Sequence, residues 1–256
     1  MTSRAKKITK STGAGAVVAK CRKEYEAVLK VRTSNLDSYF NETSLAKRHQ
    51  QAHQRLLDVE NVLLQVKGRR EYRLFEMAVQ LLAEGLYQVS CANYRLAFFC
   101  LRSFLETSVA GVRFSAFEYE LREWEAGRRD VSWTVLSGDE TGCFSVNYAN
   151  AFLPEIRDEV KHYQGLARRV YRECSEYVHG NPKSYAMAAC MDGERVSGWF
   201  ELFDAATTAV LFCFFVRYMK DISVDGMNED LRLILETELG HFSEIRSLIG
   251  GRGRDD

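Results

Sequence analysis

The scarcity of proline is the feature that most constrains the fold of this chain. Only two prolines, Pro154 and Pro182, occur in 256 residues. Proline removes a backbone donor and breaks a helix interior, so long stretches without it can run as uninterrupted helix. Apolar residues recur along these stretches with a period of about 3.6 residues, the pattern of amphipathic helices. The sequence therefore predicts an all-α protein, built as an up-and-down helical bundle.

An N-terminal segment, residues 14–68, is predicted to form a helical hairpin ahead of the bundle. Two apolar stripes, joined by the polar residues 33–43, have the alternating spacing of coiled-coil-like packing, and Gly68 marks their end. The first stripe holds Val18, Cys21, Tyr25 and Val28, and the second holds Leu45, His49, Ala52, Leu56, Val59, Leu63 and Val66. Residues 1–13, which are basic, and residues 249–256 are expected to be disordered tails.

Residues 69–248 are predicted to form the bundle itself. Helices are expected over residues 71–90, 93–114, 154–179, 198–222 and 228–248, and Gly165 is a point at which the third could bend. The fourth is apolar almost all round, which places it in the middle of the bundle. Two segments between helices, residues 127–150 and 183–196, have no helical period and are expected to be long loops, with a turn at Asp192 and Gly193.

Charge and cysteine usage limit the functional classes. The chain has 35 basic and 35 acidic residues, so no overall field draws it to nucleic acid or to an anionic membrane. Seven cysteines without paired spacing fit free thiols in a reducing compartment, and we expect a cytoplasmic protein. The apolar run over residues 205–216 is too short to span a membrane. The basic N-terminus also has the composition of a transit peptide, but we favour a tail leading into a basic helix.

A polar cluster is predicted where the third bundle helix ends. Arg172 and His179 lie seven residues apart, about two helical turns, so they share one face. Ser175 and Glu176 fall on that face, and Gly180 stops the helix just beyond the histidine. Local geometry alone thus brings a phosphate-binding cation, a proton-transfer group and a carboxylate together.

A second charged stripe lies on the helix expected over residues 93–114. Arg95, Arg102, Glu106 and Arg113 are nearly aligned in helical projection, while most other positions are apolar. One interpretation is that the stripe is the solvent face of an amphipathic helix. The other is that it faces the cluster at residues 172–179, together with Arg168, across a groove. In the second case Glu106 is the natural partner of Arg172, because charges on apolar helices need pairing.

The residues of the cluster around Arg172 and His179 are suited to phosphodiester cleavage. Arginine holds a phosphate bidentately, and histidine can take a proton from a ribose hydroxyl or give one to the leaving oxygen. Ser175 could bind phosphate or ribose, and Tyr171 or Tyr177 could stack on a base. The mechanism needs no metal, and we expect no cofactor. Against this, a helix-terminal histidine often only caps free carbonyls.

The region over residues 94–182 resembles the HEPN superfamily. The resemblance is carried by Arg102, Ser103 and Glu106, by Trp124, Gly127, Asp130 and Trp133, and by the run Ser175, Glu176, Tyr177, Val178, His179, Gly180. It implies a helical bundle, a metal-independent ribonuclease of defence or toxin type with Arg172 and His179 as its motif, and a homodimer that lines one RNA cleft. Glu173 departs from the family pattern, in which Asn, Asp or His commonly follows the arginine.

Two functional hypotheses result. In the first, the protein is an endoribonuclease with His179 as general acid/base, Arg172 as phosphate clamp, and Arg102, Glu106, Ser175, Glu176, Arg168 and Tyr177 in support. In the second, it is a non-catalytic scaffold or binding protein of a multiprotein defence assembly, and the N-terminal hairpin docks a protein partner or antitoxin.

Overall fold

The computed structural model describes residues 11–179, 191–222, 228–242 and 245–246, with side chains from residue 15 onward. Every secondary-structure element within these ranges is helical. The elements are α1 (Ser11–Asn41), α2 (Thr43–Leu64), α3 (Tyr72–Ser90), α4 (Tyr94–Ala116), α5 (Glu118–Glu125), α6 (Trp133–Leu136), α7 (Val146–Phe152), η1 (Pro154–Glu159), α8 (Val160–Val178), α10 (Gly193–Tyr218) and α11 (Glu229–Leu239).

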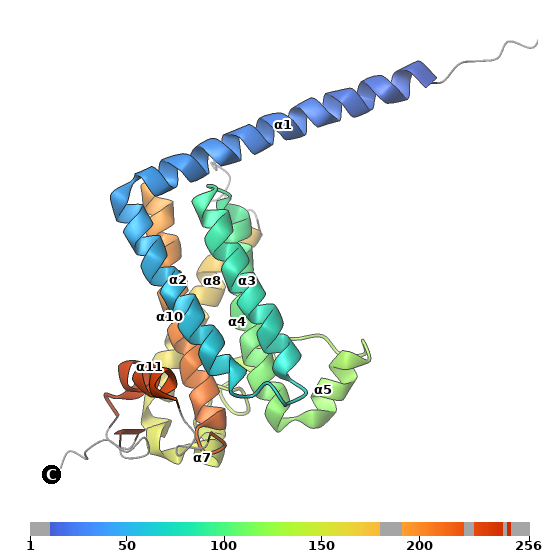
Figure 1. Ribbon diagram of the computed structural model, residues 1–256. Helices are drawn as coiled ribbons and strands as arrows, with labels where there is room; N and C mark the ends of the chain where they lie inside the picture. Colours follow the sequence, from blue (N-terminus) through green and yellow to red (C-terminus); the bar gives the residue numbers. More distant parts are fainter. Residues whose placement is uncertain (1–10, 180–190, 223–227, 243–244, 247–256) are drawn as a thin grey trace, which may run out of the picture.

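The predicted all-α helical bundle is confirmed. Helices α2, α3, α4, α8 and α10 lie side by side and alternate in direction (Figure 1). At one end of the bundle the hydroxyl of Tyr94, at the start of α4, accepts a hydrogen bond of 2.7 Å from the backbone N–H of Asp192, just before α10. At the same end Arg95 contacts the last turn of α8. Helices α4 and α10 therefore begin where α8 ends.

Helix α10 forms the centre of the bundle, as its sequence predicts. Over residues 205–216 every side chain except that of Thr208 is buried, whereas Glu194, Ser197, Glu201 and Asp204 leave one side of the first half exposed. It is long and apolar enough to cross a membrane by length and composition alone, yet 83% of its most apolar stretch is buried inside the protein. The turn expected at Asp192 and Gly193 is instead the start of this helix, because the Asp192 carboxylate accepts from the N–H groups of residues 194 and 195.

The predicted N-terminal hairpin does not form. Helix α1 continues through the polar residues 33–41, so only Glu42 separates it from α2 and no loop reverses the chain. Helix α2 buries its stripe against α3 and α10, whereas α1 leaves the bundle as a long arm (Figure 1). The expected packing between the two stripes was therefore wrong: Val18 and Tyr25 are 67% and 71% exposed.

The corner between arm and bundle has its own small core. Tyr39 is fully buried, contacts the rings of Phe40 and His49 edge-on, and its hydroxyl lies 3.3 Å from Nδ1 of His49. Glu42 caps α2 through the N–H and hydroxyl of Ser44. These contacts hold the direction in which α1 leaves.

The other predicted elements agree in part. Helices α3 and α4 occur within about two residues of their predicted bounds, in line with the usual uncertainty of helix ends. Pro154 begins a 3₁₀ turn rather than the α-helix, and α8 runs through Gly165 without a break. The loop expected over residues 127–150 contains the short helix α6 and most of α7. Of the predicted tails, residues 11–13 belong to α1, and residues 1–10 and 249–256 lie outside the described residues.

Arg113 shows that the charged stripe of α4 is not simply a solvent face. Its side chain is 6% exposed and meets Glu120 of α5 in a bidentate pair, with distances of 2.6 Å from Nε to Oε2 and 2.8 Å from Nη2 to Oε1. Its third nitrogen donates to the carbonyl of Thr141 at 2.9 Å. One guanidinium thus ties α4 to α5 and to the loop that precedes α7.

This pair predicts an acid-dependent stability. Hydrogen bonds from Arg113 hold the pKa of Glu120 below its ordinary value, so the pair stabilises the fold above that value and is lost as pH falls through the lowered pKa. We expect Glu120→Gln to reduce the free energy of unfolding at neutral pH by about 3 kcal/mol. The mutant should then lose less stability on acidification than the wild type. Urea unfolding across this pH range measures both effects, and Glu118→Gln, at an exposed position nearby, should change little.

Two helical glycines predict opposite effects of adding a methyl group. A Cβ at Gly111 of α4 would lie 2.8 Å from the ring of Phe75, whereas one at Gly165 of α8 would meet nothing within 4 Å. We expect Gly111→Ala to cost about 1–2 kcal/mol through overpacking. Gly165→Ala should add roughly 0.5–1 kcal/mol, because alanine restricts the unfolded chain. Thermal and urea unfolding measure the stability of both variants. A Gly111→Ala variant more stable than the wild type would contradict the tight contact between α3 and α4.

Candidate functional site

The end of α8 is held by α4. Helix α8 ends at Val178, and His179 is its C-cap residue. Nη2 of Arg95, in the first turn of α4, donates to the carbonyl of Val178 at 3.1 Å. This contact satisfies one of the carbonyls that a helix end leaves free. It also fixes His179 at the surface above α4.

Arg102 organises the polar groups at this point. Its Nη2 donates to the hydroxyl of Tyr171 at 2.8 Å, its Nε lies 3.4 Å from Oε2 of Glu106, and its Nη1 lies 3.4 Å from Nε2 of His179. The guanidinium also lies 4.4 Å from the centre of the Tyr171 ring, which stacks on Trp133 at 4.6 Å. We call Arg102, Glu106, Trp133, Tyr171 and His179 the Arg102 cluster.

The cluster combines a half-buried ion pair with an exposed imidazole. The side chains of Arg102 and Glu106 are 16% and 25% exposed, and His179 is exposed. Burial raises the pKa of the Glu106 carboxyl, and the neighbouring Arg102 opposes that rise. Since arginine can only donate, Nε2 of His179 is the acceptor in this contact.

Arg172 lies outside the cluster. Its side chain is 74% exposed, and its Nη2 lies 3.9 Å from Oε1 of the neighbouring Glu173. In helical projection it lies about 160° from the buried Cys174, so it points into solvent. The expected pairing of Glu106 with Arg172 was therefore wrong, because Arg102 occupies that place. Arg172 and His179 remain on neighbouring faces of α8 and both open to solvent.

Ser175 and Arg168 are engaged elsewhere. The hydroxyl of Ser175 donates to the carbonyl of Tyr171 at 2.5 Å, within the same helix. Arg168 donates to the carbonyl of Ser137 at 3.1 Å and to Oδ1 of Asp139 at 2.8 Å. The bond from Arg168 to Asp139 and one from Gln164 lower the pKa of the Asp139 carboxyl. Arg168 thus anchors the loop after α6 rather than facing α4, while Glu176 is exposed.

Tyr177 lies in a different environment from His179. Its ring stacks on Phe98 with 3.6 Å between centroids, and burial raises the pKa of its hydroxyl. It borders a groove of about 550 Å³ whose acidic lining residues are Glu173, Asp192, Glu194 and Glu201. An acidic groove repels a polyanion, so the structure offers no support for base stacking at Tyr177.

Two residues at this site, Trp133 of the Arg102 cluster and Arg95 beside it, were not assigned a role by sequence reasoning. Trp133 was quoted only as part of a family resemblance, and Arg95 only as a member of a stripe. The seven-residue spacing of Arg95 and Arg102 matches that of Arg172 and His179, and this was the available signal. The spacing does not reveal that α4 faces Tyr171 and His179 rather than Arg172.

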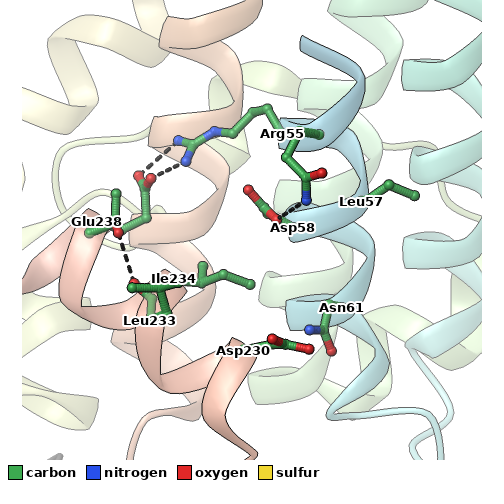
Figure 2. A pocket seen from close by; sticks show the side chains of 10 residues that line it. Arg55, Leu57, Asp58, Asn61, Asp230, Leu233, Ile234 and Glu238 are labelled. Carbon is green, nitrogen blue, oxygen red and sulfur yellow. Dashed lines mark hydrogen bonds and ion pairs between the residues drawn. The ribbon is translucent and has the colours of Figure 1, made fainter. Parts of the chain in front are cut away.

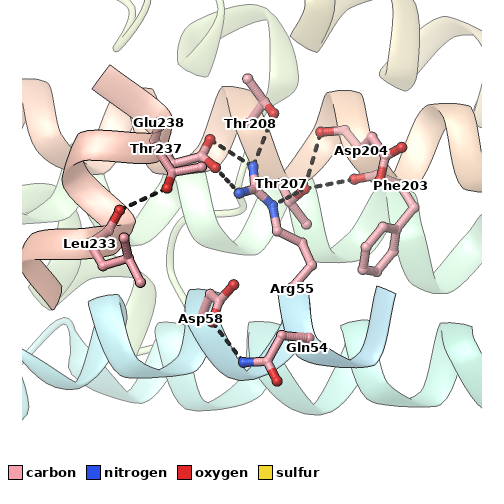
Figure 3. A network of polar contacts seen from close by, with 10 residues as sticks. All are labelled: Gln54, Arg55, Asp58, Phe203, Asp204, Thr207, Thr208, Leu233, Thr237 and Glu238. Atoms are coloured by element: carbon pink, nitrogen blue, oxygen red, sulfur yellow. Dashed lines mark hydrogen bonds and ion pairs between the residues drawn. The ribbon is translucent and has the colours of Figure 1, made fainter. Parts of the chain in front are cut away.

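A second polar site lies between α2 and α11, where a pocket of about 520 Å³ opens beside Arg55, Asp58, Asp230 and Glu238 (Figure 2). Arg55 forms a bidentate pair with Glu238, with 2.8 Å between Nη2 and Oε2. It also donates to the hydroxyls of Thr207 and Thr208 on α10 at 3.2 and 3.1 Å (Figure 3). All three guanidinium nitrogens are used between helices, so this network joins α2, α10 and α11.

Neither site is arranged as a metal centre. Within the part of the chain that the structure describes, no three His, Cys, Asp or Glu side chains gather in a group that could hold an ion. Comparisons of this chain with protein-family models, with curated proteins and with solved structures returned no match.

Removing the hydroxyl of Tyr171 from the Arg102 cluster should lower the stability of the fold. Tyr171→Phe keeps the stack on Trp133 but removes the acceptor of Arg102, so we expect the free energy of unfolding to fall by about 1.5 kcal/mol. Urea unfolding measures the change. Tyr119→Phe, where the side chain is 71% exposed, is the matched control and should have no effect. Equal stability of both variants would contradict the bond from Arg102.

Proposed function

We propose that the protein is a metal-independent endoribonuclease of a defence or toxin-type system, with its active site at the exposed end of α8. The observation that carries the proposal is the contact of 3.4 Å between Nη1 of Arg102 and Nε2 of His179, whose side chain stays exposed. Arg172, two turns earlier on α8, is also exposed and is free to meet a phosphate. The resemblance to HEPN proteins, in which an arginine and a histidine line an RNA cleft, supports this interpretation.

Each residue has a different role in the proposed reaction. The 2′-hydroxyl of RNA attacks the adjacent phosphorus, and the bond from phosphorus to the 5′-oxygen breaks. His179 takes the proton of the 2′-hydroxyl or delivers one to the leaving 5′-oxygen. Arg172, on its long exposed side chain, holds the phosphate, and Arg102 orients the imidazole and stabilises the charge that develops on phosphorus oxygens. In a homodimer a second copy would supply the complementary acid or base.

The test compares RNA cleavage by the wild type, His179→Ala and Arg172→Ala, in the presence of chelator. We expect His179→Ala to reduce the rate at least about 100-fold, as is common for loss of a general acid or base. Arg172→Ala should reduce it by a smaller factor and raise the RNA concentration needed for half-maximal rate. His162→Ala, at an exposed position earlier on α8, is the matched control. Growth of cells expressing each variant gives a second readout.

Equal activity of all four proteins, or no cleavage at all, would remove the catalytic claim. A second function would then gain support, that of a non-catalytic scaffold in a multiprotein assembly. Two observations favour it. Arg95 and Arg102 already donate hydrogen bonds to α8, at the carbonyl of Val178 and the hydroxyl of Tyr171, and Glu173 places a negative charge beside Arg172. In that case His179→Ala would lower the melting temperature without changing any nuclease activity.

A further inference from the structure

A shallow hollow of about 370 Å³ lies beside the last turn of α8, on the flank that faces α4. The described residues that line it are Asn93, Arg95, Leu96 and Phe99 of α4 and Val178 of α8. Phe99 and Leu96 are 46% and 37% exposed, so the hollow is mostly apolar and open to solvent. We call it the Phe99 hollow. Single exposed apolar residues are ordinary on a protein surface, so the surroundings of Phe99 decide whether it has a role.

Two arginines that contact the end of α8 flank Phe99 along α4. Arg95 lies one turn before it and Arg102 about one turn after it, and both fall within about 60° of Phe99 in helical projection. Arg95 donates to the carbonyl of Val178, and Arg102 contacts Nε2 of His179. An exposed aromatic ring therefore lies between two cations, in a hollow whose residue Val178 directly precedes the proposed acid/base.

The ring of Phe99 has an open face, unlike the tyrosines near this site. Tyr171 stacks on Trp133, and Tyr177 stacks on Phe98. Among the residues that the structure describes, no aromatic ring or guanidinium stacks on Phe99. The sequence led us to expect base stacking at Tyr171 or Tyr177, but the aromatic face that is open to a ligand belongs to Phe99.

The two hollows at the end of α8 differ in charge. The groove beside Tyr177 is lined by four acidic residues, and Arg195 among them is paired with Asp192 at 2.9 Å. None of the described residues that line the Phe99 hollow is acidic, and Arg95 supplies a positive charge there. A phosphate chain that passes His179 is therefore repelled on the Tyr177 side and attracted on the Phe99 side.

We propose that the Phe99 hollow binds one nucleobase of single-stranded RNA, with the base stacked on the ring of Phe99 and its phosphate close to Arg95 and His179. This inference rests on the proposed ribonuclease function and adds how the same site holds its substrate. Unpaired bases stack on aromatic side chains with little regard to sequence. The bond from Arg95 to Val178 uses one of its five N–H groups, which leaves donors for a phosphate.

Binding of two uncleavable oligomers to the full chain tests the stack. The first is 2′-O-methyl hexa-adenylate, in which no 2′-hydroxyl is available to attack phosphorus. The second is an abasic oligomer with the same number of phosphates and no bases. Because both make the same phosphate contacts, only contacts with the bases separate their affinities. Titration calorimetry at low salt measures both without an aromatic dye that could itself stack on Phe99.

We expect the wild type to bind hexa-adenylate at least about 5-fold more tightly than the abasic oligomer. Phe99→Ala should remove this difference by weakening hexa-adenylate alone, whereas Phe99→Tyr keeps an aromatic face and should bind as the wild type does. Tyr119→Ala, at a 71% exposed aromatic position on α5, is the matched control and should change neither affinity. In RNA cleavage, Phe99→Ala should raise KM by a larger factor than it lowers kcat.

Three outcomes would overturn the base site. They are equal affinity of the wild type and Phe99→Ala for hexa-adenylate, an equal loss for both oligomers, and altered sedimentation of Phe99→Ala at unchanged oligomer affinity, which would show a protein contact instead.

Failure of the ribonuclease proposal gives a different result. Binding of hexa-adenylate that depends on Phe99, without any cleavage of RNA, would remove the catalytic role of His179 and keep the base site. Cleavage that needs His179 but is indifferent to Phe99→Ala would keep the catalytic role and remove the base site.

Discussion

The burial of the second half of α10, residues 205–216, on nearly all its faces is the constraint on which the rest of the structure depends. A helix that presents Phe, Leu, Val and Trp in every direction must be enclosed, and α2, α4 and α8 enclose it. Helices α2 and α8 do so with one apolar stripe each, which leaves their other faces free for polar contacts, whereas α4 is buried on most of its faces. The network from Arg55 to Glu238 and the two threonines of α10 lies on such a border, between α2, α10 and α11.

The Arg102 cluster is a consequence of this arrangement. Because α4 and α8 pack on the same side of α10 and on each other, the start of α4 meets the end of α8. Arg102 then lies within reach of both Tyr171 and His179, and Glu106 completes its charge balance. The proposed catalytic role of His179 depends on this placement, since an imidazole fixed by a neighbouring arginine at the surface is available to a substrate in a way that a core histidine is not.

The packing of α2 also explains why α1 stands out as an arm. Helix α2 buries its apolar stripe within the bundle, so it has no further apolar face on which α1 could pack. The corner at Tyr39, Phe40 and His49 then fixes the direction of α1 without covering its outer part. Val17, Val18, Tyr25, Val28 and Leu29 of α1 therefore stay exposed.

The amino-acid sequence by itself determined that the chain is helical, where α3 and α4 begin and end, and that α10 is central, because periodicity and helix-ending residues are local properties. It also located the end of α8 as a polar site. Only the tertiary structure decided which faces meet: that Arg102 rather than Arg172 lies beside His179, that Tyr177 faces an acidic groove, and that α1 turns away from α2. Periodicity reveals which side of a helix is apolar, but what covers that side depends on packing between segments far apart in the chain.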